Sequence, residues 1–79
     1  MKISMNTDLK IKGENIHVQT EDWGLQHKKI VSRVFKHGQM IKSFEVPYNE
    51  IDPSFKDSKI KTYVESFHNH VIDFVYEEM

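Results

Sequence analysis

Apolar side chains alternate with polar ones along the first half of the chain, and this two-residue period predicts β-strands. The apolar positions carry odd numbers up to Ile11 and even numbers from Ile16 onward. A tight turn around Gly13-Glu14-Asn15 explains the change, because a turn resets which residues face the core. We expect two short strands joined by this turn, the second of which ends at Trp23-Gly24.

A second pair of strands is predicted on either side of His37-Gly38, a dipeptide suited to the tip of a hairpin. Residues 28–36 and 39–46 are rich in the β-branched and aromatic side chains that favour strands. A proline follows Val46 and is expected to end the sheet, because proline cannot donate a hydrogen bond to a neighbouring strand.

The register that follows from this tip places Arg33 opposite Lys42, and it puts Phe35 and Phe44 together on the core face. Like charges directly opposite each other destabilise a strand pair. We therefore expect an acidic group nearby, either from a partner or from the neighbouring strand that carries Glu21-Asp22.

The period changes to that of a helix after Phe55. Apolar residues then follow steps of four and three, at Ile60, Val64, Phe67, Val71 and Phe74. Asp52-Pro53-Ser54 offers the capping oxygen and the proline that are typical of a helix start. These patterns predict an α+β fold with a three- to four-stranded antiparallel β-meander within residues 1–47. One long C-terminal helix, over about residues 54–77, is expected to pack on one face, and residues 1–79 are expected to form a single domain.

The predicted helix is longer than the sheet that it covers. Its roughly 22 residues span about 33 Å, whereas strands of seven or eight residues span about 25 Å. The last turns would therefore expose apolar side chains, and exposed patches of this kind usually mark an interface. We expect a homodimer through this helix, with Phe67, Val71, Phe74 and Val75 in the interface.

The charges of the helix oppose its dipole, because lysines lie near its N-terminal end and acidic residues near its C-terminal end. An antiparallel partner helix would place the lysines of one chain beside the acidic residues of the other. The alternative is that these charges are solvated, in which case each costs only a few tenths of a kcal/mol.

Length and composition narrow the class of protein. A chain of 79 residues buries a small core, which makes oligomerisation an expected source of stability. The absence of Cys excludes disulfides and thiolate metal sites, and a net charge of −1 gives no overall attraction to nucleic acid. The sequence contains neither an apolar run approaching the ~18 residues of a membrane span nor a signal-peptide core, so we expect a cytoplasmic protein that does not bind membranes.

Positive charge is concentrated between residues 28 and 42, a segment without acidic residues. The basic side chains are Lys28, Lys29, Arg33, Lys36 and Lys42. Together with Trp23, which is either an exposed anchor or a plug in the core, they are our candidate partner-binding residues. We predict a small non-enzymatic protein-interaction or adaptor module whose protein partner the sequence does not identify. The alternative is nucleic-acid binding by this basic hairpin, which aromatic residues on the core face would not assist.

Residue patterns that support catalysis or metal binding are scarce. His68 and His70 lie two positions apart on the predicted helix and point in different directions, so they cannot bind one ion. Glu65 and His68 could share a site only with a second copy. Glu21 and Asp22 are neighbours on a strand and face opposite sides, which disfavours an acid-base pair. We therefore expect no enzyme activity, no cofactor and no metal.

Three segments together resemble a small family of bacterial proteins that have no assigned activity. They are the octapeptide His17-Val18-Gln19-Thr20-Glu21-Asp22-Trp23-Gly24, the hairpin from Ile30 to Ile41, and Tyr48 with the C-terminal helix. The similarity covers roughly residues 15–71. It implies the order strand, Gly-tipped hairpin, tyrosine and helix, and it implies no activity.

Overall fold

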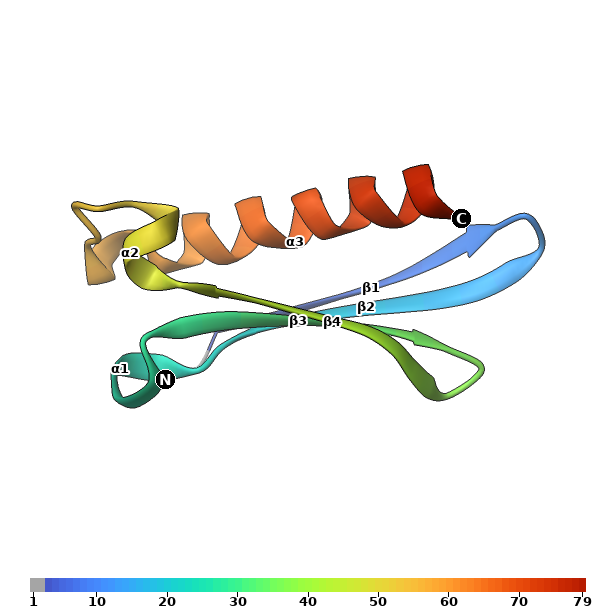
Figure 1. Ribbon diagram of the computed structural model, residues 1–79, viewed down its shortest axis with the longest axis horizontal. Coiled ribbons are helices and arrows are strands. Elements are labelled where there is room, and N and C mark those ends of the chain that lie inside the picture. Colours follow the sequence, from blue (N-terminus) through green and yellow to red (C-terminus); the bar gives the residue numbers. More distant parts are fainter. Residues whose placement is uncertain (1–2) are drawn as a thin grey trace.

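The computed structural model describes residues 3–79 and shows four antiparallel strands with one long helix across one face of the sheet (Figure 1). The strands are β1 (Ser4–Ile11), β2 (Glu14–Asp22), β3 (Lys29–Lys36) and β4 (Gln39–Pro47), and they lie side by side in chain order. The predicted α+β fold with an antiparallel meander and a C-terminal helix is confirmed. Residues 1 and 2 of the predicted strand region lie outside the described residues.

Both hairpins turn on two residues with positive φ, the backbone conformation that matches the right-handed twist of the flanking strands. In the first hairpin they are Lys12 (φ 52°) and Gly13 (φ 82°), so Glu14 and Asn15 already belong to β2 rather than to the turn. In the second they are the predicted pair His37-Gly38. Glycine is suited to the second position of each turn because it lacks the Cβ atom that disfavours positive φ.

The long C-terminal helix begins later than its sequence pattern predicts. Two single turns, α1 (Gly24–His27) and α2 (Tyr48–Ile51), and the 3₁₀ turn η1 (Asp57–Lys59) precede the long helix α3 (Ile60–Glu78). The predicted start at residue 54 is wrong because Asp52 closes a local turn instead, in which the Ser54 N–H donates to Asp52 Oδ1 over 2.9 Å. The other carboxylate oxygen accepts from the Tyr63 hydroxyl at 2.8 Å.

The β3–β4 hairpin contains an irregularity that the predicted register lacks. Phe35 pairs with Met40 as expected, but Val34 pairs with Lys42, so Ile41 is an extra residue on β4. Arg33 consequently lies opposite a serine, and the predicted juxtaposition of Arg33 with Lys42 is wrong.

The same shift separates two aromatic residues that the sequence pattern placed together. A shift of one residue moves a side chain to the other face of a strand. Phe44 contacts Phe74 of α3 at a ring-centroid distance of 5.1 Å, whereas Phe35 lies on the other side of the sheet, 6.1 Å from the His17 ring. The prediction that Phe35 and Phe44 share the core face is therefore wrong.

The core lies between α3 and one face of the sheet. One apolar cluster contains Ile11, Ile16, Val18, Val34, Val71 and Val75, and the other contains Ile30, Tyr48, Tyr63 and Val64. The 19 residues of α3 span about 28 Å and the nine residues of β2 about 30 Å, so the helix does not extend beyond the sheet.

This packing removes the premise of a dimer through the helix. Val71 and Val75 are only 4% and 3% exposed and pack within their own chain. Phe67 and Phe74 are half-buried, Phe67 against the core cluster and Phe74 against Phe44. The predicted overhang is wrong because the helix starts later and the strands are longer than expected. Val71 and Val75 are core residues of one chain, Phe67 packs against that core, and Phe74 contacts Phe44 beside it.

Candidate functional site

The face of the sheet opposite α3 is left largely uncovered. Within residues 3–79, only the single turn α1 lies on that side, at one end of the sheet (Figure 1). We call this surface the open face. Strand pairing places on it the side chains of Asn6, Asp8, His17, Gln19, Glu21, Lys29, Val31, Arg33, Phe35, Met40, Ser43 and Glu45.

Trp23 lies at one end of the open face, between β2 and α1. Lys29 Nζ lies 4.7 Å from the centre of its ring and Arg33 Cζ lies 5.5 Å from it, distances at which a cation is attracted to the ring. The His27 ring meets Trp23 edge to face at 5.5 Å. Trp23 is half-buried and belongs to neither apolar cluster, which favours the anchor over the core plug.

Each of the two cations also has an acidic neighbour on the same face. Lys29 donates to Glu45 Oε1 over 3.3 Å, and Arg33 Nη1 lies 4.0 Å from Glu21 Oε1. The expected acidic group near Arg33 is thus Glu21 on the neighbouring strand. Pairs this exposed stabilise a fold by only about 0–1 kcal/mol each, so their main effect is to hold the cations in place over Trp23.

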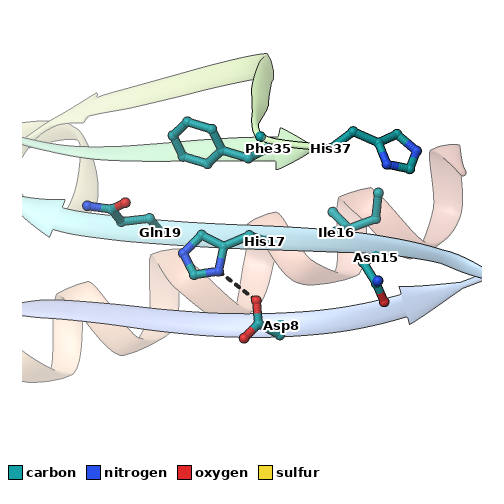
Figure 2. Close-up of a pocket in the computed structure, with 8 residues that line it drawn as sticks. Asp8, Asn15, Ile16, His17, Gln19, Phe35 and His37 are labelled. Atoms are coloured by element: carbon teal, nitrogen blue, oxygen red, sulfur yellow. Dashed lines mark hydrogen bonds and ion pairs between the residues drawn. The ribbon is translucent and has the colours of Figure 1, made fainter.

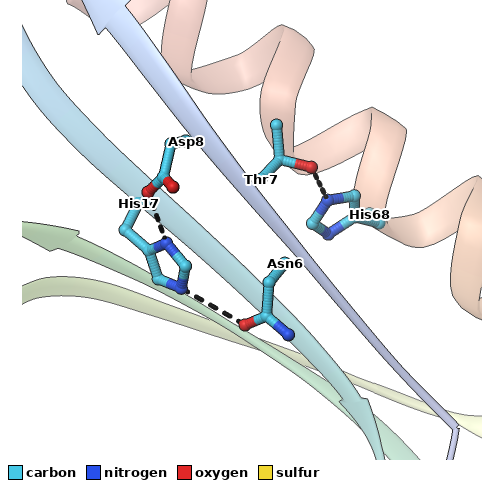
Figure 3. A network of polar contacts seen from close by, with 5 residues as sticks. All are labelled: Asn6, Thr7, Asp8, His17 and His68. Atoms are coloured by element: carbon cyan, nitrogen blue, oxygen red, sulfur yellow. Dashed lines mark hydrogen bonds and ion pairs between the residues drawn. The ribbon is translucent and has the colours of Figure 1, made fainter.

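The other end of the open face contains an imidazole with two polar neighbours. His17 donates from Nδ1 to Asp8 over 2.8 Å, and its Nε2 lies 3.2 Å from the side-chain oxygen of Asn6 (Figure 3). A shallow hollow of about 470 Å³ lies beside it, between Phe35 and His37 (Figure 2). His37 contacts Glu14 Oε2 at 2.7 Å.

The five basic residues of the hairpin segment do not form one surface. Lys29 and Arg33 lie on the open face, whereas Lys36 and Lys42 pair with Ile16 and Val34 and therefore lie on the α3 side. Lys42 Nζ is 5.7 Å from the Phe74 ring. Lys28 ends α1 with φ 52°, and its N–H bonds to the Gly24 carbonyl.

A buried polar network lies on the covered side of the sheet. His68 is 1% exposed and has a threonine hydroxyl on each ring nitrogen. Thr7 lies 2.8 Å from Nε2 (Figure 3), and Thr20 lies 2.6 Å from Nδ1. Thr20 also bonds to the Ser32 hydroxyl at 2.8 Å. Burial, assisted by the charge of His17 across the sheet, lowers the pKa of His68. The network thus joins α3 to β1, β2 and β3.

Asp22 and Tyr48 form a second buried contact. The Asp22 carboxylate accepts hydrogen bonds from the Tyr48 hydroxyl and from the Gly24 N–H, the latter over 3.0 Å. Burial and this carboxylate raise the pKa of Tyr48 well above its usual value. Asp22 and Glu21 face opposite sides of β2, as predicted, so they do not act as a pair.

The octapeptide singled out in the sequence divides between the two sides of β2. Thr20 and Asp22 point inward and bond to His68 and Tyr48, whereas His17 and Glu21 belong to the open face. Sequence reasoning missed His17 and Phe35 as neighbours on this face. The pairing of β2 with β3 brings them together. Alternation along β2 indicates that His17 shares a face with Gln19 and Glu21, but the contact with Phe35 depends on the register between the two strands.

No family model, curated protein or solved structure matches this chain. Residues 3–79 contain no helix long and apolar enough to cross a membrane. In the same part of the chain, no three His, Asp or Glu side chains gather as a metal ion would require. His68, which the sequence offered as a metal ligand with Glu65, instead lies in the core.

Proposed function

We propose that the protein is a non-enzymatic interaction module that binds a protein partner through the open face. The observation that supports this most is the half-exposed Trp23 ring with Lys29 and Arg33 held against it. Tryptophan and arginine contribute disproportionately to binding energy at protein interfaces. Side chains that are ordered before binding also lose less entropy when the partner arrives.

The distribution of charge favours a protein partner over nucleic acid. Lys29 and Arg33 alternate on the open face with Glu21, Glu45 and Asp8, which would repel phosphate groups. Lys36 and Lys42, which a basic ribbon would need, lie on the opposite side of the sheet. Mixed charges around an aromatic anchor are typical of protein interfaces.

The placement of His17 and His68 favours binding over catalysis. Both ring nitrogens of His17 are engaged by Asp8 and Asn6 on an open surface, and His68 is buried beneath α3. A catalytic base needs a free nitrogen within reach of a substrate. The open face is therefore better suited to recognition than to proton transfer.

The proposal is tested by affinity capture from the native cell extract with two double variants of equal charge change. Trp23→Ala with Arg33→Glu disrupts the open face, whereas Thr62→Ala with Lys61→Glu makes a similar change on the exposed outer side of α3. We expect the first to lose a protein band that the second retains, with far-UV circular dichroism unchanged in both. Retention of the same proteins by both variants would overturn the proposal, as would captured nucleic acid that salt releases.

A further inference from the structure

We infer that a partner of the open face is a second copy of the same chain, which makes the protein a homodimer with its two sheets packed face to face. This inference rests on the proposed function, because it uses the same surface. The dimer predicted through α3 is not its basis, since Val64, Val71 and Val75 of that helix are buried within one chain.

The first argument is that the open face is complementary to itself. Along the strands, Glu21 and Glu45 lie level with Val31, between Lys29 on one side and Arg33 on the other. A partner of one charge sign would meet repulsion on part of such a surface. A second copy related by a twofold axis presents the same mixture of signs and can set each charge against its opposite.

The second argument is the position of the Glu21–Arg33 pair on the two central strands. Their side chains are 29% and 36% exposed, and their closest atoms are 4.0 Å apart, which is beyond hydrogen-bond range. A guanidinium has five N–H donors, so Arg33 retains donors for a partner. A twofold axis beside this pair brings Arg33 of each chain to Glu21 of the other, in a ring of four alternating charges.

The third argument is the apolar surface around that pair. Trp23 and Phe35 are half-buried, and Met40 is 55% exposed although it lies opposite Phe35. Stacking two copies would cover these groups and would exclude water from the four charges, which strengthens their attraction. A chain of 79 residues gains from such burial because its own core is small.

The test is sedimentation equilibrium of the whole chain and two charge-reversal variants, Glu21→Arg and Arg33→Glu. We expect a dimer for the wild type at micromolar concentration and at least tenfold weaker self-association for either variant alone, because each creates four like charges at the axis. An equimolar mixture of the two variants should regain the dimer, since the two positive side chains of one variant then face the two negative side chains of the other. Lys61→Glu, on the exposed side of α3, should leave self-association unchanged.

Recovery on mixing also shows that both variants are folded, because misfolded chains could not restore a specific contact. A wild type that stays monomeric at several hundred micromolar would overturn the inference. So would single variants that dimerise as the wild type does, or two weakened variants whose mixture regains nothing. If the wild type is monomeric but the capture experiment loses its band on Trp23→Ala with Arg33→Glu, the open face binds a different protein. The inference then fails while the proposed function stands.

Discussion

The two faces of the sheet differ in the burial and hydrogen bonding of their polar side chains. Beneath α3, Thr20, Ser32 and His68 are buried and hydrogen-bonded to one another. On the open face, Glu21 and Arg33 are half-exposed and face each other at 4.0 Å. Among residues 3–79, no buried side-chain nitrogen or oxygen lacks a hydrogen-bond partner. The covered face is thus satisfied within one chain, whereas the open face keeps polar groups that a partner can use.

Because of this difference, the face beneath α3 should contribute mainly to folding and the open face mainly to association. A buried polar group that loses its partner costs about 1–3 kcal/mol, because it has already given up water. An exposed ion pair contributes about 0–1 kcal/mol, because water replaces it readily. Substitutions beneath α3 should therefore change the free energy of unfolding, and substitutions on the open face should change binding.

The largest effect is expected for His68→Ala, which should lower the free energy of unfolding by about 3 kcal/mol. The substitution removes a buried ring and leaves the Thr7 and Thr20 hydroxyls without their partner. His17→Ala removes an imidazole from the other side of the sheet and should cost less than about 1 kcal/mol. Urea unfolding of both variants makes the comparison, and equal losses would show that the two faces do not differ in this way.

Tyr48→Phe should destabilise the protein by about 2 kcal/mol. The buried Asp22 carboxylate accepts hydrogen bonds from the Tyr48 hydroxyl and the Gly24 N–H. The substitution removes the first of these donors and leaves the second. The matched change Tyr63→Phe removes a hydroxyl whose acceptor, Asp52, is less buried, and it should cost clearly less than Tyr48→Phe. Thermal and urea unfolding measure both losses. A larger loss for Tyr63→Phe than for Tyr48→Phe would show that the Tyr48 hydroxyl is not an important hydrogen-bond donor to Asp22.

Acidification should lower the free energy of unfolding through His68, beneath α3, and by less than the two substitutions above. Burial lowers the pKa of His68 in the folded protein, so between that pKa and the unfolded value of about 6.5 the unfolded chain binds more protons. The contribution of neutral His68 is therefore complete above about pH 6.5 and is lost as the pH falls through the folded-state pKa.

The measurement is the difference in unfolding free energy between the wild type and His68→Gln from pH 8 to pH 5. The other histidines are shared by both proteins and largely cancel in that difference. We expect the difference to shrink steadily as the pH falls. A difference independent of pH would show that His68 does not titrate differently in the folded and unfolded chains.

The periodicity of apolar residues was sufficient to predict the class of fold. Alternation gave the strands, the steps of three and four residues gave α3, and His37-Gly38 gave the hairpin tip. These signals lie within short segments of the sequence, so they can be recognised without knowing how the segments pack together. The start of α3 was missed for a local reason as well, because an Asp-Pro-Ser segment serves a turn as readily as a helix cap.

The open face could be predicted only in part. Of the six predicted partner-binding residues, Trp23, Lys29 and Arg33 lie together on this face, whereas Lys36 and Lys42 lie on the α3 side. The extra residue Ile41 has no sequence signal, because a bulge depends on how two strands twist and pack. That single residue decides that Lys42 leaves the open face and that Phe35 lies on it without Phe44.

The smallest effect is expected for Lys29→Met, which removes a charge but keeps an unbranched side chain over the Trp23 ring. Its partner Glu45 is 60% exposed, so water can solvate that carboxylate when the ammonium group is gone. The free energy of unfolding should change by less than about 0.5 kcal/mol, measured by urea unfolding at moderate salt. A loss as large as that of Tyr48→Phe would mean that the cations over Trp23 hold the strands together. The open face would then be part of what stabilises the fold, and the separation between a folding face and a binding face would fail.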